Sequence, residues 1–262
     1  MKEAIILAGG LGTRLRSVVN DVPKCMAPVN GIPFLNFVIA YLKNEGIERI
    51  ILSLGYKSEL IIEHIEKNFT HAGIEIDYVI EASPLGTGGA IKLACSKVKG
   101  NQVLVLNGDT LFNINLRDFA GFHLSKKADF TAALKEMKDF SRYGAVDTDV
   151  NHRLTFFHEK TYCEKGLING GIYALSKEHF LAIDFPAVFS FEKDFLEAYL
   201  TRMKFYGFPF NDYFIDIGIP EDYQHFAENY AYILSRTRNR QTGSAGFGIV
   251  EGFFEYLGEL LL

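Results

Sequence analysis

Short apolar runs alternate with segments of helical periodicity over the first 110 or so residues. Residues 4–8 are wholly apolar and end at a glycine pair, which is typical of a strand buried on both faces of a parallel sheet. Residues 34–45 have apolar side chains at helical spacing, and 49–54 again predict a buried strand. Helical patterns at 60–68 and 88–98 alternate with strand-like runs at 75–80 and 103–106. This order predicts an α/β fold with a doubly wound, mostly parallel mixed sheet of Rossmann-like type.

The pattern changes in the second half of the chain. Alternating or aromatic strands at 130–135 and 144–147, with a helical stretch near 192–200, predict a smaller lobe on the main domain. We predict one domain over residues 1–236, a flexible polar linker over 237–246, and an amphipathic segment over 247–262. The last segment fits either an artificial appended peptide or a natural docking or oligomerisation helix, so it carries no functional prediction.

Composition and charge narrow the possible partners. The 262 residues are 48% hydrophobic and 23% charged, as in ordinary globular proteins. A net charge of −5 argues against nucleic acid as the ligand. No run approaches the roughly 18 apolar residues of a membrane span, and the first residues lack the features of a secretory signal. Three widely spaced cysteines predict reduced thiols, and together these features predict a cytoplasmic location without a membrane partner.

The strongest local signal is a glycine loop after the first strand. Its residues are Leu7, Ala8, Gly9, Gly10, Leu11, Gly12, Thr13 and Arg14. Glycines let backbone N–H groups approach a phosphate closely, and the cations Arg14 and Lys24 would neutralise it. The loop lacks the Gly-Lys-Ser/Thr of a Walker A loop and the third glycine of a dinucleotide fingerprint. It predicts a site for a small phosphorylated ligand, with a plain tight turn as the alternative.

Two aspartates follow separate strands. Asp109 comes after the 103–106 strand and the pair Asn107 and Gly108, and Asp216 follows the aromatic run 213–215. Carboxylates at strand ends can converge on one hard cation such as Mg²⁺, which would join them to phosphate oxygens. Taken singly, each aspartate is equally explained as a helix cap or a turn residue.

Several motifs in the same order resemble the sugar nucleotidyltransferases, which join a nucleoside triphosphate to a sugar 1-phosphate and release pyrophosphate. The resemblance spans about residues 2–232. Its motifs lie at residues 9–14, 23–24, 84–89, 107–109, 159–160, 169–171 and 216–218. The chain departs from the family at Cys25, where a second proline is common. The resemblance implies Mg²⁺ as the cofactor, a nucleoside triphosphate and a sugar 1-phosphate as substrates, and a homo-oligomer as a common assembly.

The resemblance also implies a role for each matched residue. Arg14 and Lys24 would hold the triphosphate and Asp109 and Asp216 would bind the metal, which makes these four the predicted catalytic group. The predicted nucleotide-binding residues are Leu7, Ala8, Gly9, Gly10, Gly12, Thr13, Glu81, Gly86, Thr87, Gly88, Asn107 and Gly108. The predicted sugar-phosphate residues are Gly144, Glu159, Lys160, Asn169 and Gly170.

Glu81 indicates which base is bound. In the family's second glycine motif this position faces the edge of the base. A carboxylate accepts hydrogen bonds but cannot donate them. Guanine offers two adjacent donors, whereas uracil and thymine offer one donor flanked by acceptors. Glu81 therefore favours GTP, with a surface glutamate at a strand end as the alternative.

Further similarities at 28–35, 142–144, 190–194 and 213–220 concern the sugar. They resemble guanylyltransferases of the family that use D-glycero-D-manno-heptose 1-phosphate to make GDP-heptose for surface polysaccharide, such as lipopolysaccharide or capsule. Mannose 1-phosphate remains a rival substrate, because one hydroxymethyl group is a small difference for a pocket to recognise. A catalytically silent nucleotide-sugar-binding module and a glycosyltransferase are the alternatives from other classes. The retained cations and carboxylates argue against the first, and the phosphate loop argues against the second.

Overall fold

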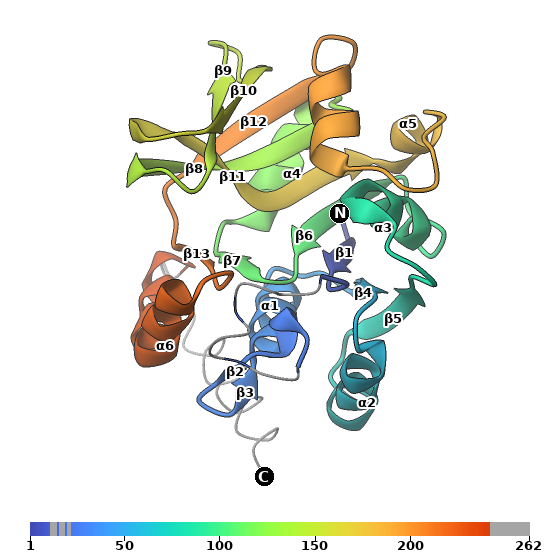
Figure 1. The fold of residues 1–262 in the computed structure, drawn as a ribbon, viewed down its shortest axis with the longest axis vertical. Helices are drawn as coiled ribbons and strands as arrows, with labels where there is room; N and C mark the ends of the chain where they lie inside the picture. Colours follow the sequence, from blue (N-terminus) through green and yellow to red (C-terminus); the bar gives the residue numbers. More distant parts are fainter. Residues whose placement is uncertain (11–14, 16–18, 20–21, 242–262) are drawn as a thin grey trace.

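A nine-stranded mixed sheet with helices on both faces forms the body of the protein (Figure 1). The computed structural model describes residues 1–10, 15, 19 and 22–241. The strand order is β10-β9-β11-β6-β1-β4-β5, with β8 paired to β11 and β12 paired to β8. The predicted α/β fold with a mixed sheet is confirmed.

Four parallel strands make up the nucleotide half of the sheet, as this half is named from here on. They lie in the order β6 (Gln102–Asn107), β1 (Glu3–Leu7), β4 (Arg49–Leu54) and β5 (Glu75–Ile80). β1 and β6 are neighbours in space, but β4 and β5 separate them in sequence. The winding of the chain therefore reverses between β1 and β6. In open α/β sheets such a switch point leaves a crevice at the carboxyl ends of the strands, where ligands bind.

The other half of the sheet is largely antiparallel and forms the smaller lobe. It contains β8 (Phe130–Phe140), β9 (Gly144–Thr148), β10 (Leu154–Lys160), β11 (Cys163–Ser176) and β12 (Phe205–Phe210). The end of β11 pairs with β6, and most of its length pairs with β8. The register of β11 against β8 shifts between Asn169 and Tyr173, where Gly171 has a φ of +73°. The 14-residue β11 therefore belongs to both halves of the sheet.

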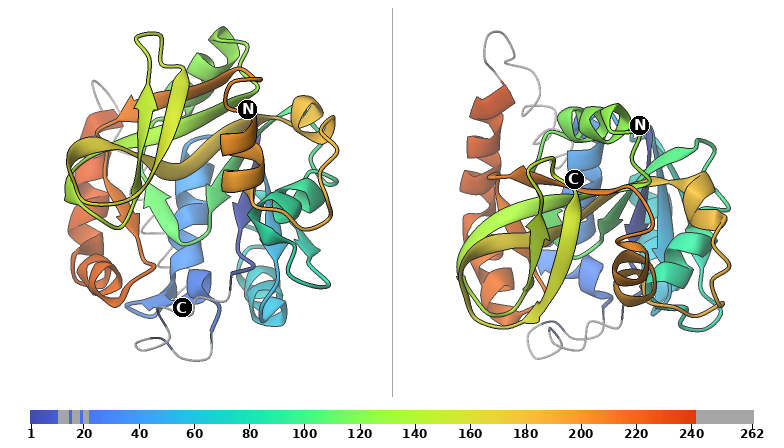
Figure 2. Two further views of the ribbon diagram at one scale, coloured as in Figure 1. Left: turned by 45° about the horizontal axis from the view of Figure 1, so that its top comes forward. Right: turned by 90° about the horizontal axis from the view of Figure 1, so that it is seen from above.

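Alternate residues of the central strands face two separate cores, because side chains of a strand point to opposite faces. Ala4 and Ile6 belong to one core, with side chains from four helices. These helices are α1 (Phe34–Asn44), α2 (Ser58–Asn68), α4 (Leu116–Ser125) and α6 (Pro220–Gln241). Ile5 belongs to the other core, with side chains of α3 (Gly86–Ala94), α5 (Lys177–Leu181) and η2 (Phe191–Glu197). Figure 2, seen from above, shows α4 and η2 on opposite sides of the sheet.

Helix η2 differs from a regular α-helix. η2 is a π-helix, in which hydrogen bonds join residues five apart, and such segments are frequent at functional sites. Its N-terminus is capped by Ser190, whose Oγ accepts a hydrogen bond from Lys193 N at 3.2 Å.

Short elements complete the described chain. They are η1 (Lys24–Met26), the hairpin of β2 (Pro28–Val29) and β3 (Ile32–Pro33), and the antiparallel pair of β7 (Thr110–Phe112) and β13 (Phe214–Asp216). The predicted domain boundary at residue 236 falls inside α6, and the segment 247–262 lies outside the described residues. Among the helices in the described part, none has the length and apolar character needed to cross a membrane.

Candidate functional site

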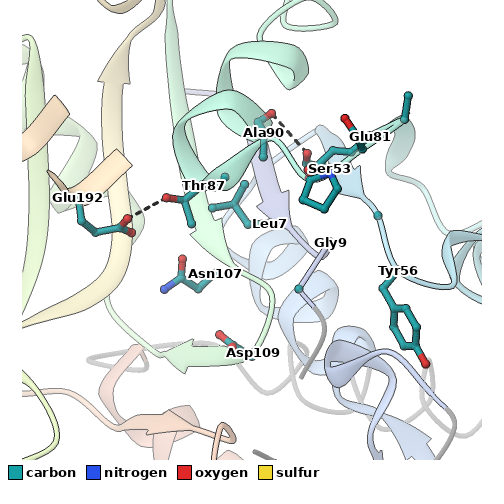
Figure 3. A pocket seen from close by; sticks show the side chains of 16 residues that line it. Leu7, Gly9, Ser53, Tyr56, Glu81, Thr87, Ala90, Asn107, Asp109 and Glu192 are labelled. Atoms are coloured by element: carbon teal, nitrogen blue, oxygen red, sulfur yellow. Dashed lines mark hydrogen bonds between the residues drawn. The ribbon is translucent and has the colours of Figure 1, made fainter. Parts of the chain in front are cut away.

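A cavity of about 620 Å³ opens where the parallel strands end (Figure 3). This nucleotide cavity is of ordinary size for a small-molecule site. The predicted nucleotide-binding residues that line it are Leu7, Gly9, Gly10, Glu81, Gly86, Thr87 and Asn107, and Asp109 joins them. Segments that follow all four parallel strands thus contribute to one cavity at the switch point between β1 and β6.

The remaining predicted nucleotide-binding residues do not line this cavity or are not described. Ala8 is buried, and Gly108 packs so closely that an added Cβ would come 2.7 Å from the carbonyl oxygen of Leu7. An added Cβ on Gly88 would lie 2.2 Å from the ring of Phe189. The close packing of these glycines positions the backbone around the cavity. Gly12, Thr13 and Arg14 lie outside the described residues.

Glu81 borders the glycine loop. Its Oε2 accepts a hydrogen bond from Leu85 N at 2.9 Å, and its Oε1 is 2.8 Å from the position that a Cβ on Gly9 would take. Gly9 is therefore required for the close approach of this carboxylate. Each carboxylate oxygen has two acceptor positions, so the bond to Leu85 leaves room for two donors of a base.

Lys24, Asp109 and Asp216 come together at one point. Lys24 Nζ lies 2.5 Å from Asp109 Oδ2 and 3.4 Å from Asp216 Oδ1. The pairing of β7 with β13 places the two carboxylates, because it sets Asp216 opposite Thr110. Gly218 leaves the necessary space, since a Cβ there would come 2.6 Å from Lys24 Nζ. Two residues far apart in sequence thus direct their carboxylates to one cation.

The donor set of this cluster fits a magnesium ion. Burial raises the pKa of Asp216, the nearby charge of Asp109 raises it further, and the Lys24 ammonium lowers it. A pair of close carboxylates in such a place favours a cation between them. In the described part of the chain, no group of three or more His, Cys, Asp or Glu side chains could surround a metal. Two carboxylates are nevertheless enough for Mg²⁺, which commonly keeps several waters and takes phosphate oxygens as further ligands.

A second cavity, of about 300 Å³, lies beside the first and is called the sugar cavity below. Of the predicted sugar-phosphate residues, Gly144, Lys160, Asn169 and Gly170 line it, and Asp216 also does so. Glu159 does not line it and is exposed on β10. The pairing of β10 with β9 shifts register between Phe157 and Lys160, and after this irregularity Lys160 lines the cavity while Glu159 does not.

Some residues that line the sugar cavity were not among the predicted site residues. Arg142 and Tyr143 line the sugar cavity directly before Gly144, and the resemblance at 142–144 was the available signal. Arg142 Nη2 lies 2.6 Å from Asp222 Oδ2, and its guanidinium stacks over the Tyr143 ring. Burial, with the charge of Asp216, raises the pKa of Tyr143 to about 12. A neutral tyrosine hydroxyl and a fixed guanidinium therefore form one wall of this cavity.

Glu192 was also missed. Together with Asn107 it lines both cavities, whereas the other residues of each lining belong to one cavity alone. Asn107 contacts Gly171 closely, because a Cβ on that glycine would lie 2.9 Å from Asn107 Nδ2. Asn107 and Glu192 therefore mark the place where the two cavities meet.

Comparison with known proteins agrees with this geometry. The family model described as "Nucleotidyl transferase" matches residues 3–232. The chain belongs to the nucleotidyl transferase family. A D-glycero-alpha-D-manno-heptose 1-phosphate guanylyltransferase from Aneurinibacillus thermoaerophilus is 51% identical over 222 residues, which are 85% of this chain and 95% of that protein. The protein of the same name from Campylobacter jejuni is 48% identical, over 87% of this chain and 99% of that protein.

More distant relatives and solved structures belong to the same family. A mannose-1-phosphate guanylyltransferase from Mycobacterium tuberculosis is 35% identical over 84% of this chain and 62% of that protein. The crystal structure of HddC from Yersinia pseudotuberculosis superposes with a TM-score of 0.80 at 41% identity, covering 88% of this chain and 100% of that one. The crystal structure of HddC complexed with GMP-PN gives a TM-score of 0.79 at 42% identity.

Proposed function

We propose that the protein transfers GMP from GTP to D-glycero-α-D-manno-heptose 1-phosphate, with GDP-heptose and pyrophosphate as products. The main support is the identity of 51% and 48% to heptose 1-phosphate guanylyltransferases over nearly their whole length. The mannose-1-phosphate enzyme is less similar, at 35%, and this chain spans only 62% of it. The two adjoining cavities provide separate space for a nucleotide and a sugar phosphate.

The reaction needs no general base from the protein. The attacking atom is a phosphate oxygen of the sugar phosphate, whose second pKa is about 6, so the group is largely dianionic at pH 7. The protein must instead position two anionic substrates and offset their charges. Lys160 in the sugar cavity would bind the sugar's phosphate, and Lys24, beside Asp109 and Asp216, would bind the triphosphate.

Asp109 and Asp216 would hold the magnesium ion of this reaction. When bound there, Mg²⁺ offsets negative charge at the α-phosphate and orients the phosphate oxygens for in-line displacement. The support within this chain is the convergence of the two carboxylates on a single cation, Lys24 Nζ.

GTP is the proposed nucleotide because of Glu81. Its carboxylate ends in the nucleotide cavity and presents only acceptors, which match the two adjacent donors of guanine. The crystal structure of HddC complexed with GMP-PN supports the same choice of base.

The proposal also includes a cytoplasmic location and a role in surface polysaccharide synthesis. Cys25, Cys95 and Cys163 are all free thiols, as expected in a reducing compartment. The polysaccharide role follows from the proposed product, GDP-heptose.

Pyrophosphate release tests the proposed function directly. The purified protein with Mg²⁺ is assayed with GTP, ATP, CTP, UTP and dTTP, each combined with heptose, mannose and glucose 1-phosphates. We expect release with GTP and the heptose phosphate. Release with GTP and mannose phosphate alone would correct the sugar. No release with any pair would favour the nucleotide-sugar-binding module.

Single substitutions test the metal site in the same assay. Asp109→Asn and Asp216→Asn should each lower kcat by roughly 100-fold or more, because each removes a charge that the metal requires. Turnover within tenfold of wild type in both variants would contradict the metal assignment.

A further inference from the structure

Glu192 lies where the nucleotide cavity meets the sugar cavity. It is the second residue of η2 and reaches the site from the face of the sheet that carries α3. Figure 3 shows it at the opposite end of the nucleotide cavity from Glu81 and Tyr56, with Asn107 and Asp109 between them. It is therefore far from the end of the cavity assigned to the base and adjacent to the sugar cavity, which it also lines.

Two hydroxyl groups fix the carboxylate of Glu192. Thr87 Oγ1 donates to Glu192 Oε2 at 2.8 Å, and Ser190 Oγ donates to the same oxygen at 3.1 Å. Thr87 Oγ1 in turn accepts a hydrogen bond from Phe191 N at 2.9 Å. The Thr87 hydroxyl thus joins the beginning of α3, which borders the nucleotide cavity, to the beginning of η2.

The surroundings of Glu192 favour a hydroxyl group as its ligand. Tyr173 and Asn169 line the sugar cavity, and Asn169 Nδ2 donates to the Tyr173 hydroxyl at 3.0 Å. Glu192 lines the same cavity as Tyr173, and burial raises the pKa of Tyr173, with the charge of Glu192 as the next cause. A carboxylate repels phosphate groups but accepts strongly from hydroxyl groups. In the proposed function, the phosphates would have Lys24 and Lys160 as their partners.

We propose that Glu192 binds a ring hydroxyl of the sugar 1-phosphate through Oε1, and that Thr87 is its positioning residue. This inference rests on the proposed function and assigns a sugar contact within it. Since Thr87 borders the nucleotide cavity, the Thr87–Glu192 hydrogen bond couples the two binding sites. A nucleotide that orders the 84–88 loop also orders the sugar-binding carboxylate, so each substrate increases the affinity for the other.

Steady-state kinetics of Glu192→Gln test the sugar contact. Glutamine keeps the size of the side chain but loses the charge, and a hydrogen bond to a charged group contributes about 1.5–3 kcal/mol. The KM for the sugar 1-phosphate should therefore rise roughly tenfold or more, while the KM for GTP stays within about twofold. Asp184→Asn is the matched control, because Asp184 is exposed outside both cavities and loses the same charge. It should leave both constants unchanged.

Variants of Thr87 test the positioning role. Thr87→Val removes the hydroxyl and should raise the sugar-phosphate KM, although Thr87 does not line the sugar cavity. Thr87→Ser keeps the hydroxyl and should have a sugar-phosphate KM close to that of the wild type. If Thr87 acted only through the packing of its methyl group, Thr87→Ser would raise the KM instead. In the double variant of Thr87→Val and Glu192→Gln the two effects should be less than additive.

Calorimetry measures the coupling without turnover. Sugar 1-phosphate should bind the wild-type protein more tightly when a non-hydrolysable GTP analogue is present, and this gain should disappear in Glu192→Gln. An unchanged sugar-phosphate KM in Glu192→Gln, or an effect on GTP alone, overturns the inference. If the wild-type protein releases no pyrophosphate with any substrate pair, the proposed function fails instead, and calorimetry still reports whether Glu192 binds sugar phosphate.

Discussion

His123 makes the stability of the protein depend on pH. The side chain is 1% exposed in α4 and bonds Thr131 Oγ1 through Nδ1 and Gln102 Oε1 through Nε2, both at 2.8 Å. The amide oxygen can only accept, so Nε2 carries the proton and Nδ1 accepts from the threonine hydroxyl. Burial lowers the pKa of His123 from 6.5 to about 4, against a smaller opposing effect of Asp129. The folded protein therefore keeps this imidazole neutral.

The magnitude follows from the two pKa values. As the pH falls below 6.5, His123 binds a proton in the unfolded chain, whereas in the folded chain it does not bind one until about pH 4. The free energy of unfolding therefore falls across this interval. At about 1.4 kcal/mol per pH unit, the full effect is about 3 kcal/mol, of which about 2.5 kcal/mol falls between pH 7.5 and 4.5.

Urea unfolding of wild type and His123→Gln, followed by far-UV circular dichroism, measures this effect. Glutamine keeps an amide donor and acceptor but does not titrate. Other carboxylates titrate in the same range and contribute to both proteins, so their contributions cancel in the difference. The free energy of unfolding of His123→Gln should fall about 2.5 kcal/mol less than that of wild type between pH 7.5 and 4.5. An equal fall in both proteins would refute the argument.

Three further predictions concern other parts of the fold. Arg49→Met should destabilise the protein by roughly 3–5 kcal/mol in urea unfolding, because it leaves the buried Glu3 carboxylate without its ion-pair partner. Lys2→Met, at an exposed ion pair, should cost less than about 1 kcal/mol, and equal losses would contradict the burial argument. Glu81→Gln should reduce the preference for GTP over UTP about tenfold or more in pyrophosphate release, and unchanged selectivity would remove Glu81 from base recognition. Lys160→Ala should raise the sugar-phosphate KM roughly tenfold or more with little change for GTP, whereas a rise for GTP alone would reassign this lysine.

Local signals in the sequence were sufficient for the nucleotide half of the sheet. Residues 4–8 are apolar without alternation, and 49–54 are apolar apart from Arg49 and Ser53, because both faces of these strands are buried; glycines follow both runs. The spatial order of the strands, which sets the switch point between β1 and β6, comes from the structure and not from the sequence pattern. Strand periodicity therefore predicted the α/β class, and Gly9 and Gly10 of the predicted phosphate loop line the nucleotide cavity.

Contacts between distant segments could not be predicted in this way. The resemblance at 190–194 pointed to this segment but not to Glu192 itself, whose partner Thr87 is 105 residues away. The π-helix is equally hidden, because the buried positions Phe191, Phe195 and Leu196 fit an α-helix as well. The irregular pairing of β10 with β9 between Phe157 and Lys160, which leaves Glu159 outside the lining of the sugar cavity, also has no signal in the sequence. These features depend on tertiary placement, which periodicity does not contain.

Strand β11 has a consequence for how the family can diversify. Its last residues are held in the central sheet by β6, whereas β9 meets it at the single register pair Ile168 and Ala145. The β9–β10 hairpin supplies much of the sugar cavity, and in the described part of the chain it pairs with β11 and, through the bridge between Arg153 and Tyr206, with β12, but not with β1, β4, β5 or β6. Mutations in the hairpin can therefore accumulate without disturbing the register of the parallel strands. Substitutions that line this cavity can therefore change its shape during evolution while the residues at the ends of β1 and β6 are inherited unaltered.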